Sequence, residues 1–455
     1  MATPAPGLSA LRAPRHWPLV AAHVRLVFAV NAALIVVIWL RHFNFDAAKT
    51  PAAALTGAGQ LAALLGTYLV LVGLLFVART PFLDQIYGDR AAKLHKTIGC
   101  WAVVLISVHI VCSVAGYALT DGISASDEFS TIVLTYPYAL AAAVGFVMFL
   151  LIGTSSIRFV RSHLSYETWT GLHLYAYLAV ILAFGHQLAV GSDFANHPLS
   201  RMYWVALYAA VAGLIVVFRI TAPLVLLARH RFRIARVVVE TSDVVSIYLE
   251  GRQLDRLRVR AGQYFRIRLL VRDEWWRSHP FSISAAPDGD SLRFTVKALG
   301  DFSERLQALG PGPRVMLEGP YGALTGALRT REGVALIGGG IGVTPIRALF
   351  EEFAGSVDVN LIYRASRIED VAFSSELDKI ARRTRARVTY LLGRRGSKNM
   401  PVDPLSAASL ARLVPDIESR DVFVCGPTPM MDTVERSLRE LGVPPGHVHT
   451  ERFAA

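Results

Sequence analysis

Four histidines in two long apolar stretches are the residues of this chain whose types and spacing could do chemistry. His95 and His109 lie fourteen residues apart in one stretch, and His173 and His186 lie thirteen apart in the other. At a rise of about 1.5 Å per residue, each pair spans roughly 20 Å along a helix, which is most of the ~30 Å hydrocarbon core of a bilayer. An imidazole in lipid is costly unless it is paired or ligated. Two haems stacked through the membrane, each bound by two histidines, would use all four rings.

A simpler interpretation competes with haem, because a single membrane histidine more often bonds to a neighbouring helix than to a metal. Two pairs of nearly matching spacing favour ligation. The two spacings are not equivalent, however: at ~100° per residue, fourteen residues return to nearly the same helix face, and thirteen miss it by more than a third of a turn. The second helix would need local overwinding, a tilt or a bent ligand to aim both rings at the first.

Long apolar runs fill the first half of the chain. The 455 residues are 53% hydrophobic with a mean hydropathy of +0.41, and the length suits about three domains. After a cytoplasmic lead over residues 1–18 we expect a transmembrane haem domain over 19–228, built as a bundle of six helices. The expected spans cover roughly residues 19–40, 57–78, 95–118, 135–154, 172–190 and 202–227.

The basic residues predict how these spans are oriented. Arginines and lysines gather before span one, between spans two and three, between four and five, and after six, whereas the connection 119–134 has none. By the positive-inside rule both termini are cytoplasmic. We expect a multi-pass protein of the cell membrane, in a bacterial inner membrane, with lipid as a partner. Spans three and five then both run outward, so His95 and His173 form the inner pair and His109 and His186 the outer pair.

Composition excludes several other classes. The three cysteines, Cys100, Cys112 and Cys425, offer neither a disulfide framework nor the clustered ligands of an iron–sulfur centre. The net charge of +12 comes largely from residues that flank the spans, and no aromatic–basic recognition motif accompanies it. We therefore expect no nucleic-acid partner.

The second half of the chain predicts two soluble domains. Residues 229–330 show period-two apolarity broken by Gly and Pro, which predicts a small antiparallel β-barrel. Residues 331–455 alternate strands with helices, which predicts a doubly wound α/β domain with a parallel sheet.

A phosphate-binding turn lies at the start of the last domain. A strand runs into a glycine-rich turn and then a helix, so backbone N–H groups and a helix N-terminus face the ligand. The residues concerned are Gly338, Gly339, Gly340, Gly342, Thr344 and Pro345. Cys425 ends a later strand, followed by Gly426 and Pro427, at the edge where ligands bind in such sheets. A buried thiol that only packs is the alternative for Cys425.

Four motifs carry a family resemblance: HPFSIS (279–284), GDFS (300–303), GGGIGVTP (338–345) and CGP (425–427). In this order they resemble the ferredoxin–NADP reductase type of flavoprotein. Joined behind six spans with two histidine pairs, they resemble the ferric reductase and NADPH oxidase superfamily, in its prokaryotic form. The resemblance covers nearly the whole chain from about residue 57, and it implies FAD, NADPH and two b-type haems as cofactors.

The resemblance also implies roles for single residues. His279, Pro280, Phe281 and Ser282 match the flavin motif, with Phe281 against the isoalloxazine and Ser282 near its reactive nitrogen. Gly300 and Ser303 match the stretch that holds the FAD pyrophosphate, Ser303 supplying a hydroxyl donor. Phe453 is the candidate for an aromatic that covers the flavin, although two residues follow it here. Core packing is the alternative for both phenylalanines. The implied catalytic residues are Ser282, Cys425 and Phe453.

Nucleotide choice is also implied by the resemblance. Arg364 and Ser366 lie where this family places groups for the 2′-phosphate of NADPH, and a guanidinium offers a bidentate fork for phosphate. A solvated basic loop is the alternative.

The implied activity is transmembrane electron transfer from NADPH through FAD and the two haems to a small-molecule acceptor outside. We favour a ferric chelate or another external acceptor, because Ser113 stands where the oxidase branch commonly has a histidine; oxygen, giving superoxide, is the alternative. A transporter or channel with a regulatory nucleotide-binding tail would need carboxylates or broken helices at the midplane, and spans three to five hold no such carboxylate. A haem-binding anchor with an inactive flavin domain is a third possibility.

Overall fold

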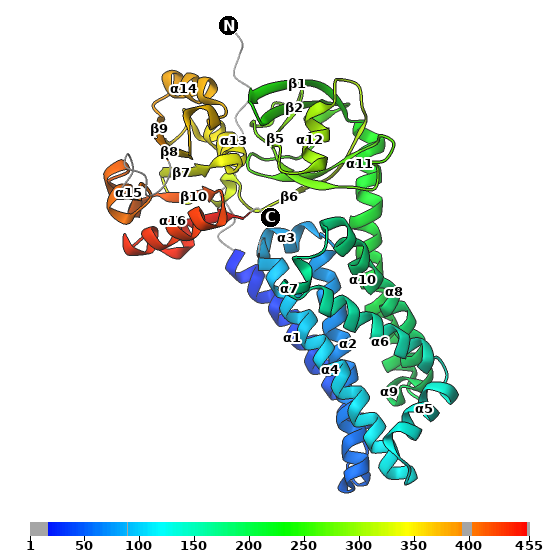
Figure 1. Ribbon diagram of the computed structural model, residues 1–455. Helices are drawn as coiled ribbons and strands as arrows, with labels where there is room; N and C mark the ends of the chain where they lie inside the picture. The colour runs from blue at the N-terminus through cyan, green and yellow to red at the C-terminus, as the bar shows by residue number, and fades with distance from the viewer. Residues whose placement is uncertain (1–16, 89, 394–402, 453–455) are drawn as a thin grey trace. The chain divides into compact units, whose positions relative to one another are not determined.

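The computed structural model describes residues 17–88, 90–393 and 403–452 and divides the chain into two compact units. One unit, Leu19–Thr80 with Arg90–Arg219, is a bundle of helices. The other includes Pro81–Asp89 and Ile220–Ala455 and contains all the strands among the described residues. Figure 1 colours these elements along the chain.

Long helices joined by short ones build the first unit. They are α1 Trp17–His42, α2 Pro51–Val77, α4 Arg90–Asp121, α5 Ala125–Thr135, α6 Ala139–Ser155, α7 Arg158–Arg161, α8 Tyr166–Val190, α9 Ser192–Ala195 and α10 Pro198–Ile215. A π-helical segment, Val216–Thr221, continues α10 into α11 Ala222–His230, and α3 is Pro81–Tyr87.

Five helices among the described residues are long and apolar enough to cross a membrane, and a sixth span exists only if α5 and α6 count as one. These two helices are bent by 112°. The expected fourth span, 135–154, therefore does not run straight. Tyr136 is extended at φ −79°, ψ 138°, because the residue before a proline, here Pro137, is disfavoured in the helical region. The six-helix bundle is thus established only as five helices and a bent pair.

The expected closed barrel is wrong, because the strands form two separate antiparallel sheets. One sheet has the order β1-β2-β5 and the other β4-β3-β6. The strands are β1 Arg233–Thr241, β2 Val244–Glu250, β3 Tyr264–Leu269, β4 His279–Ser282, β5 Leu292–Lys297 and β6 Val315–Tyr321, with helix α12 Asp301–Ala308. Alternate residues of β3, Phe265, Ile267 and Leu269, are fully buried in the core between the sheets, as period-two patterning requires. Isolated bridges between Ile283 and Phe294 and between Arg233 and Arg314 join the two sheets at two places.

The last domain is a five-stranded parallel sheet of order β11-β10-β7-β8-β9. Its strands are β7 Gly333–Gly339, β8 Asp358–Ala365, β9 Arg387–Leu392, β10 Asp421–Cys425 and β11 Val448–Glu451. Its helices are α13 Val343–Phe353, α14 Ser374–Arg383, α15 Ala407–Leu413 and α16 Thr428–Glu440. The sheet order switches direction at β7, so the carboxyl ends of β7 and β10 lie side by side where a nucleotide binds in such folds.

Candidate functional site

The inner histidine pair is brought together by two helices far apart in sequence. α4 carries His95 and α8 carries His173, and their ring centroids lie 5.9 Å apart at an interplanar angle of 67°. A metal bound at about 2 Å by one nitrogen of each ring separates two imidazole centroids by roughly 6 Å. The observed separation therefore fits an iron held between these two rings.

The α4 histidines are oriented by backbone carbonyls of α2. Nδ1 of His95 lies 2.9 Å from the carbonyl oxygen of Gly73, and Nδ1 of His109 lies 3.1 Å from that of Gly59. A carbonyl only accepts, so each Nδ1 carries the proton and donates, which leaves the Nε2 lone pair for a metal. This is the usual outer hydrogen bond of a metal-binding histidine.

Glycines allow that contact by letting α2 approach α4 closely. A Cβ on Gly59 would lie 2.8 Å from the Ser113 hydroxyl, and one on Gly66 would lie 3.1 Å from Ile106. The two carbonyl-bearing glycines, Gly59 and Gly73, are spaced fourteen residues apart, like the histidines that they face. α4 packs along α2, while α8 packs along α6.

The outer pair is less well aligned. His109 and His186 are near enough to interact electrostatically. Of the two histidine pairs in the described residues, however, only the inner one has its rings in direct contact. α8 is regular α-helix throughout, so the thirteen-residue spacing is not absorbed by overwinding. Nδ1 of His173 and Nδ1 of His186 are both buried with no hydrogen-bond partner in the described residues. The His186 ring has another hydrogen bond, to the backbone of Pro137 between α5 and α6.

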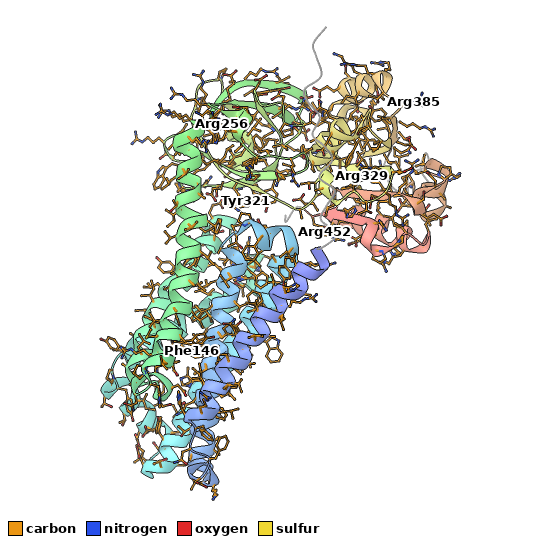
Figure 2. All side chains as sticks on the ribbon, turned by 180° about the vertical axis from the view of Figure 1, so that it is seen from behind. Phe146, Arg256, Tyr321, Arg329, Arg385 and Arg452 are labelled. Atoms are coloured by element: carbon orange, nitrogen blue, oxygen red, sulfur yellow. The ribbon has the colours of Figure 1, made fainter. Side chains whose placement is uncertain are left out.

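Ser282 marks the candidate flavin site. It ends β4, it is 3% exposed, and its hydroxyl has no hydrogen-bond partner among the described residues. In the sheet Ser282 pairs with Tyr264, which pairs on its other side with Tyr321; Tyr321 is labelled in Figure 2. A buried hydroxyl without a partner, beside two tyrosines, fits a ligand that accepts its hydrogen bond.

The two aromatic members of the flavin motif pack on the helix of the GDFS stretch. Phe302 of α12 stacks on His279 at 4.3 Å between centroids and lies nearly parallel to Phe281 at 6.3 Å. Pro280, between them in β4, is exposed. Phe281 is half-buried and so partly supports the core.

The Ser303 hydroxyl caps α12 instead of projecting freely. It accepts from the backbone N–H groups of Leu299 and Gly300 at 2.9 and 3.1 Å, and it donates to the Gly300 carbonyl at 2.7 Å. The expected hydroxyl donor is thus already used, which leaves the remaining amides of this helix start as donors for an anion.

The phosphate turn and the CGP segment pack against each other. A Cβ on Gly342 would lie 2.5 Å from the Gly426 Cα and 2.6 Å from the Cys425 carbonyl oxygen, so only glycine fits. Gly340 has φ +52°, and Thr344 in the first turn of α13 donates to the Ile341 carbonyl at 2.9 Å. A Cβ on Gly339 would clash with the side chain of Met430 in α16, the helix that begins directly after Pro427. Gly338 and the fully buried Cys425 are partners in the sheet.

The candidate 2′-phosphate residues are placed differently from one another. Arg364 donates to the Leu391 carbonyl at 2.9 Å and also to the carbonyls of Ala365 and Gly393, while Ser366 is exposed. Phe453 lies outside the described residues, and Pro345 is buried in the first turn of α13.

Sequence patterns missed Glu451 and the two tyrosines. Glu451 ends β11 in register with Cys425 and is 6% exposed. A Cβ on Gly322 would lie 3.1 Å from its Oε1, which puts a buried carboxylate at the edge of the sheet beside the predicted thiol. A single glutamate in a short strand has no sequence pattern that marks it as a site residue. The two tyrosines could have been found only from their positions on β3 and β6.

Three family models match consecutive parts of the chain. They are the ferric reductase like transmembrane component over residues 62–184, an FAD-binding domain over 229–325 and an oxidoreductase NAD-binding domain over 336–436.

Similar proteins cover the same parts. The glycine betaine monooxygenase reductase subunit of Chromohalobacter salexigens is 30% identical over 245 residues, which is 50% of this chain and 65% of that protein. A superoxide-generating NADPH oxidase heavy chain of Dictyostelium discoideum is 24% identical over 316 residues, 62% of this chain and 58% of the relative. The FAD/NAD binding domain of nitric oxide dioxygenase from Vibrio cholerae is 23% identical, covering 50% of this chain and 100% of that one at a TM-score of 0.40. The chain thus spans less than two thirds of the first two relatives.

The matched domains stand in the order that the motifs indicated, and NADPH oxidases are among the relatives that share them. The chain therefore joins a ferric reductase-like transmembrane component to an FAD-binding domain and an oxidoreductase NAD-binding domain, which is the combination that the resemblance to the ferric reductase and NADPH oxidase superfamily implies.

Proposed function

We propose that this protein carries electrons from cytoplasmic NADPH across the membrane to a ferric chelate or another acceptor outside. Both termini lie in the cytoplasm, and the domains are 19–228 for haem, 229–330 for FAD and 331–455 for nucleotide. The observation that carries the proposal is the His95–His173 pair, whose rings lie 5.9 Å apart while Gly73 holds one of them. When bound, FAD converts a hydride into single electrons and the haems carry them singly.

The residues of the chain hold and orient these groups. His95 and His173 bind the inner haem, and His109 and His186 the outer one. Ser282 donates its otherwise unpartnered hydroxyl to the flavin. Remaining cofactor contacts come from His279, Pro280, Phe281, Gly300, Ser303, Gly338, Gly339, Gly340, Gly342, Thr344, Pro345, Gly426 and Pro427, with Cys425 at the nicotinamide and Phe453 over the flavin.

Removal of a single outer ligand tests the haem assignment. His109→Ala or His186→Ala should lower the haem content by one per chain, because a bis-histidine site loses half its ligands, while NADPH still reduces the flavin. Haem per chain is measured by the pyridine haemochrome method beside FAD content. Retention of both haems in either variant contradicts the assignment.

NADPH is proposed as the donor in preference to NADH. The Arg364 guanidinium lies at the end of β8, fixed by carbonyls at the end of β9, close to exposed Ser366. Arg364→Ala should lower the ratio of kcat/KM for NADPH to that for NADH. An unchanged ratio rejects Arg364 and this loop as the source of discrimination.

The acceptor proposal depends on Ser113. Its hydroxyl lies 3.2 Å from Nδ1 of His109 and 2.8 Å from where a Cβ on Gly59 would be, so it faces α2. A serine at this position supplies no cationic imidazole to developing superoxide. Oxygen is the second candidate, supported by the superoxide-generating relative. One preparation is assayed anaerobically for ferric chelate reduction and aerobically for superoxide dismutase-sensitive cytochrome c reduction. Fast, saturable oxygen consumption with negligible anaerobic ferric reduction rejects the ferric acceptor.

A further inference from the structure

We infer that Gln187 is a positioning residue that sets the direction of His186, and so of the outer haem's ligand from α8. The inference rests on the proposed haem function. It starts from a contact inside the helical unit: Oε1 of Gln187 accepts hydrogen bonds from Nε1 of Trp204 at 2.8 Å and from the Tyr208 hydroxyl at 3.1 Å. Both donors belong to α10 and, being four residues apart, lie on one face of it.

The position of Gln187 along α8 gives this contact its consequence. Gln187 is fourteen residues beyond His173, which is the spacing that returns to nearly the same face of a regular helix. His186 is one residue short of it and therefore points about 100° away around the helix. Because α8 is uninterrupted α-helix, attachment of Gln187 to α10 fixes the rotation of the outer end of α8 and with it the direction of His186.

In the part of the chain that the structure describes, His186 lacks the Nδ1 hydrogen bond that its proposed partner His109 has. Nδ1 of His109 lies 3.1 Å from the Gly59 carbonyl, whereas Nδ1 of His186 has no hydrogen-bond partner among the described residues. A metal-binding histidine normally has such a bond to hold its ring. Beside the hydrogen bond between the His186 ring and the backbone of Pro137, the contact of Gln187 with α10 sets the direction of this ring.

The two donors are themselves fixed. Trp204 is 1% exposed and stacks on Phe194 of α9 at 5.0 Å between centroids. The Tyr208 ring packs against the ring of Phe184 with 4.4 Å between centroids, and Phe184 belongs to α8, as Gln187 does. The amide of Gln187 therefore meets a rigid surface on α10, and loss of its oxygen leaves two donors without their acceptor.

The test compares three variants of the full chain in lipid nanodiscs. Gln187→Leu removes the acceptor, and Gln187→Glu keeps oxygen acceptors at the same place. Tyr203→Phe is the matched control, because the Tyr203 hydroxyl donates at 3.0 Å to Asn31 on α1 and leaves α8 untouched. Haem per chain and the low-temperature EPR spectrum of the ferric haems are measured for each.

We expect Gln187→Leu to lose about one haem per chain or to change the EPR signal of one haem, with the other signal unchanged. Gln187→Glu and Tyr203→Phe should keep two haems and the wild-type spectrum. The inference is overturned if Gln187→Leu also keeps both, or if Tyr203→Phe loses haem to the same extent. Should Gln187→Leu not accumulate, Trp204→Phe and Tyr208→Phe each remove one donor, and wild-type spectra in both variants overturn the inference equally.

His186→Ala separates this inference from the haem proposal. If His186→Ala keeps both haems, the outer-haem assignment is wrong. If it loses one haem while Gln187→Leu keeps two with the wild-type EPR spectrum, only the role of Gln187 is wrong.

Discussion

The hydroxyl of Ser282 is buried with no partner among the described residues, and such a group costs roughly 1–3 kcal/mol in a folded protein. Ser284, two residues further, has the same chemistry but a different environment. Its hydroxyl receives hydrogen bonds from Arg293 at 3.1 Å and from Thr295 at 2.7 Å. The contrast between the two serines indicates that Ser282 is kept free for a ligand.

Ser282→Ala should slow flavin reduction by NADPH about 10- to 100-fold with FAD still bound, because one hydrogen bond near the reacting atoms is lost. Ser284→Ala is the control, since its hydroxyl serves the sheet. Both rates come from anaerobic stopped-flow absorbance of the flavin. Equal rates in wild type and Ser282→Ala would show that the hydroxyl does not serve the flavin.

Residues in local motifs could be found from the sequence, and residues defined by distant contacts could not. The glycine turn and Cys425 were each predicted at the end of a strand, and the structure shows that these strands are neighbours whose ends pack closely. The hydrogen bond between the Gly59 carbonyl and His109 could not be predicted from the sequence, because it joins a backbone atom to a side chain fifty residues away. Gln187 was hidden similarly, since a glutamine in an apolar run has no motif.

At the scale of elements, the pairing of α2 with α4 depends on glycine. A Cβ on Gly59 would press on the Ser113 hydroxyl at 2.8 Å and on the His109 carbonyl at 3.2 Å. Gly99 in α4 has nothing within 4 Å of such a Cβ. Replacing either glycine by alanine is the same chemical change, but only the change at Gly59 affects the close approach of α2 to α4.

Gly59→Ala should separate the helices near the outer site, weaken the Gly59–His109 bond and lower outer-haem content, while Gly99→Ala should keep wild-type haem. The free energy of unfolding should fall by about 1–3 kcal/mol for overpacking at Gly59. Haem per chain and thermal unfolding of the detergent-solubilised protein measure both effects. Equal haem contents in the two variants would refute the role given to the α2 carbonyl.

Strand and helix types were predictable because their periods are local, but closure and straightness were not. Period-two apolarity over residues 229–330 predicted antiparallel strands, and the structure has them as β1 to β6. Closing a barrel depends on tilt and register between distant strands, and here the strands form two sheets. The expected span over 135–154 passed through Pro137, whose presence was a signal for the observed bend.

Asp421 ties three segments together at the start of β10. Its carboxylate accepts from the backbone N–H groups of Thr330 and Arg331 at 2.6 and 2.7 Å, and it lies 3.1 and 3.0 Å from His447 and His449. Burial alone would raise its pKa, but the hydrogen bonds from His449, the two amides and His447 outweigh burial and hold the pKa of Asp421 well below its usual range.

A carboxyl whose pKa is lower in the folded than in the unfolded state stabilises fully above its unfolded pKa of about 3.9 and loses that contribution as pH falls further. The free energy of unfolding of the nucleotide-binding domain should therefore decline below about pH 4. Asp421→Asn should reduce stability at pH 7 and flatten this decline. Urea unfolding of the full chain between pH 3 and 7 measures both, and an identical pH profile in the variant would exclude Asp421 as the source.

At the scale of the whole molecule, the two soluble domains, which belong to one unit, are joined by ion pairs. Arg293 of β5 lies 2.8 Å from Glu376 of α14, which also pairs with Arg347 of α13 at 2.8 Å. Burial would raise the pKa of Glu376, but Arg347 and Arg293 outweigh it and lower that pKa. The carboxylate therefore stays charged and links Arg293 of the FAD-binding domain to the NAD-binding domain.

The most direct test of the electron path is anaerobic addition of NADPH to the purified full chain, followed by absorbance from the flavin to the haem α bands. The account predicts two haems and one FAD per chain, flavin bleaching first, and then reduction of both haems. His186→Ala should stop after one haem. If the flavin bleaches in wild-type protein with full haem content but the α bands of the reduced haems do not appear, the result contradicts transmembrane electron transfer by this chain.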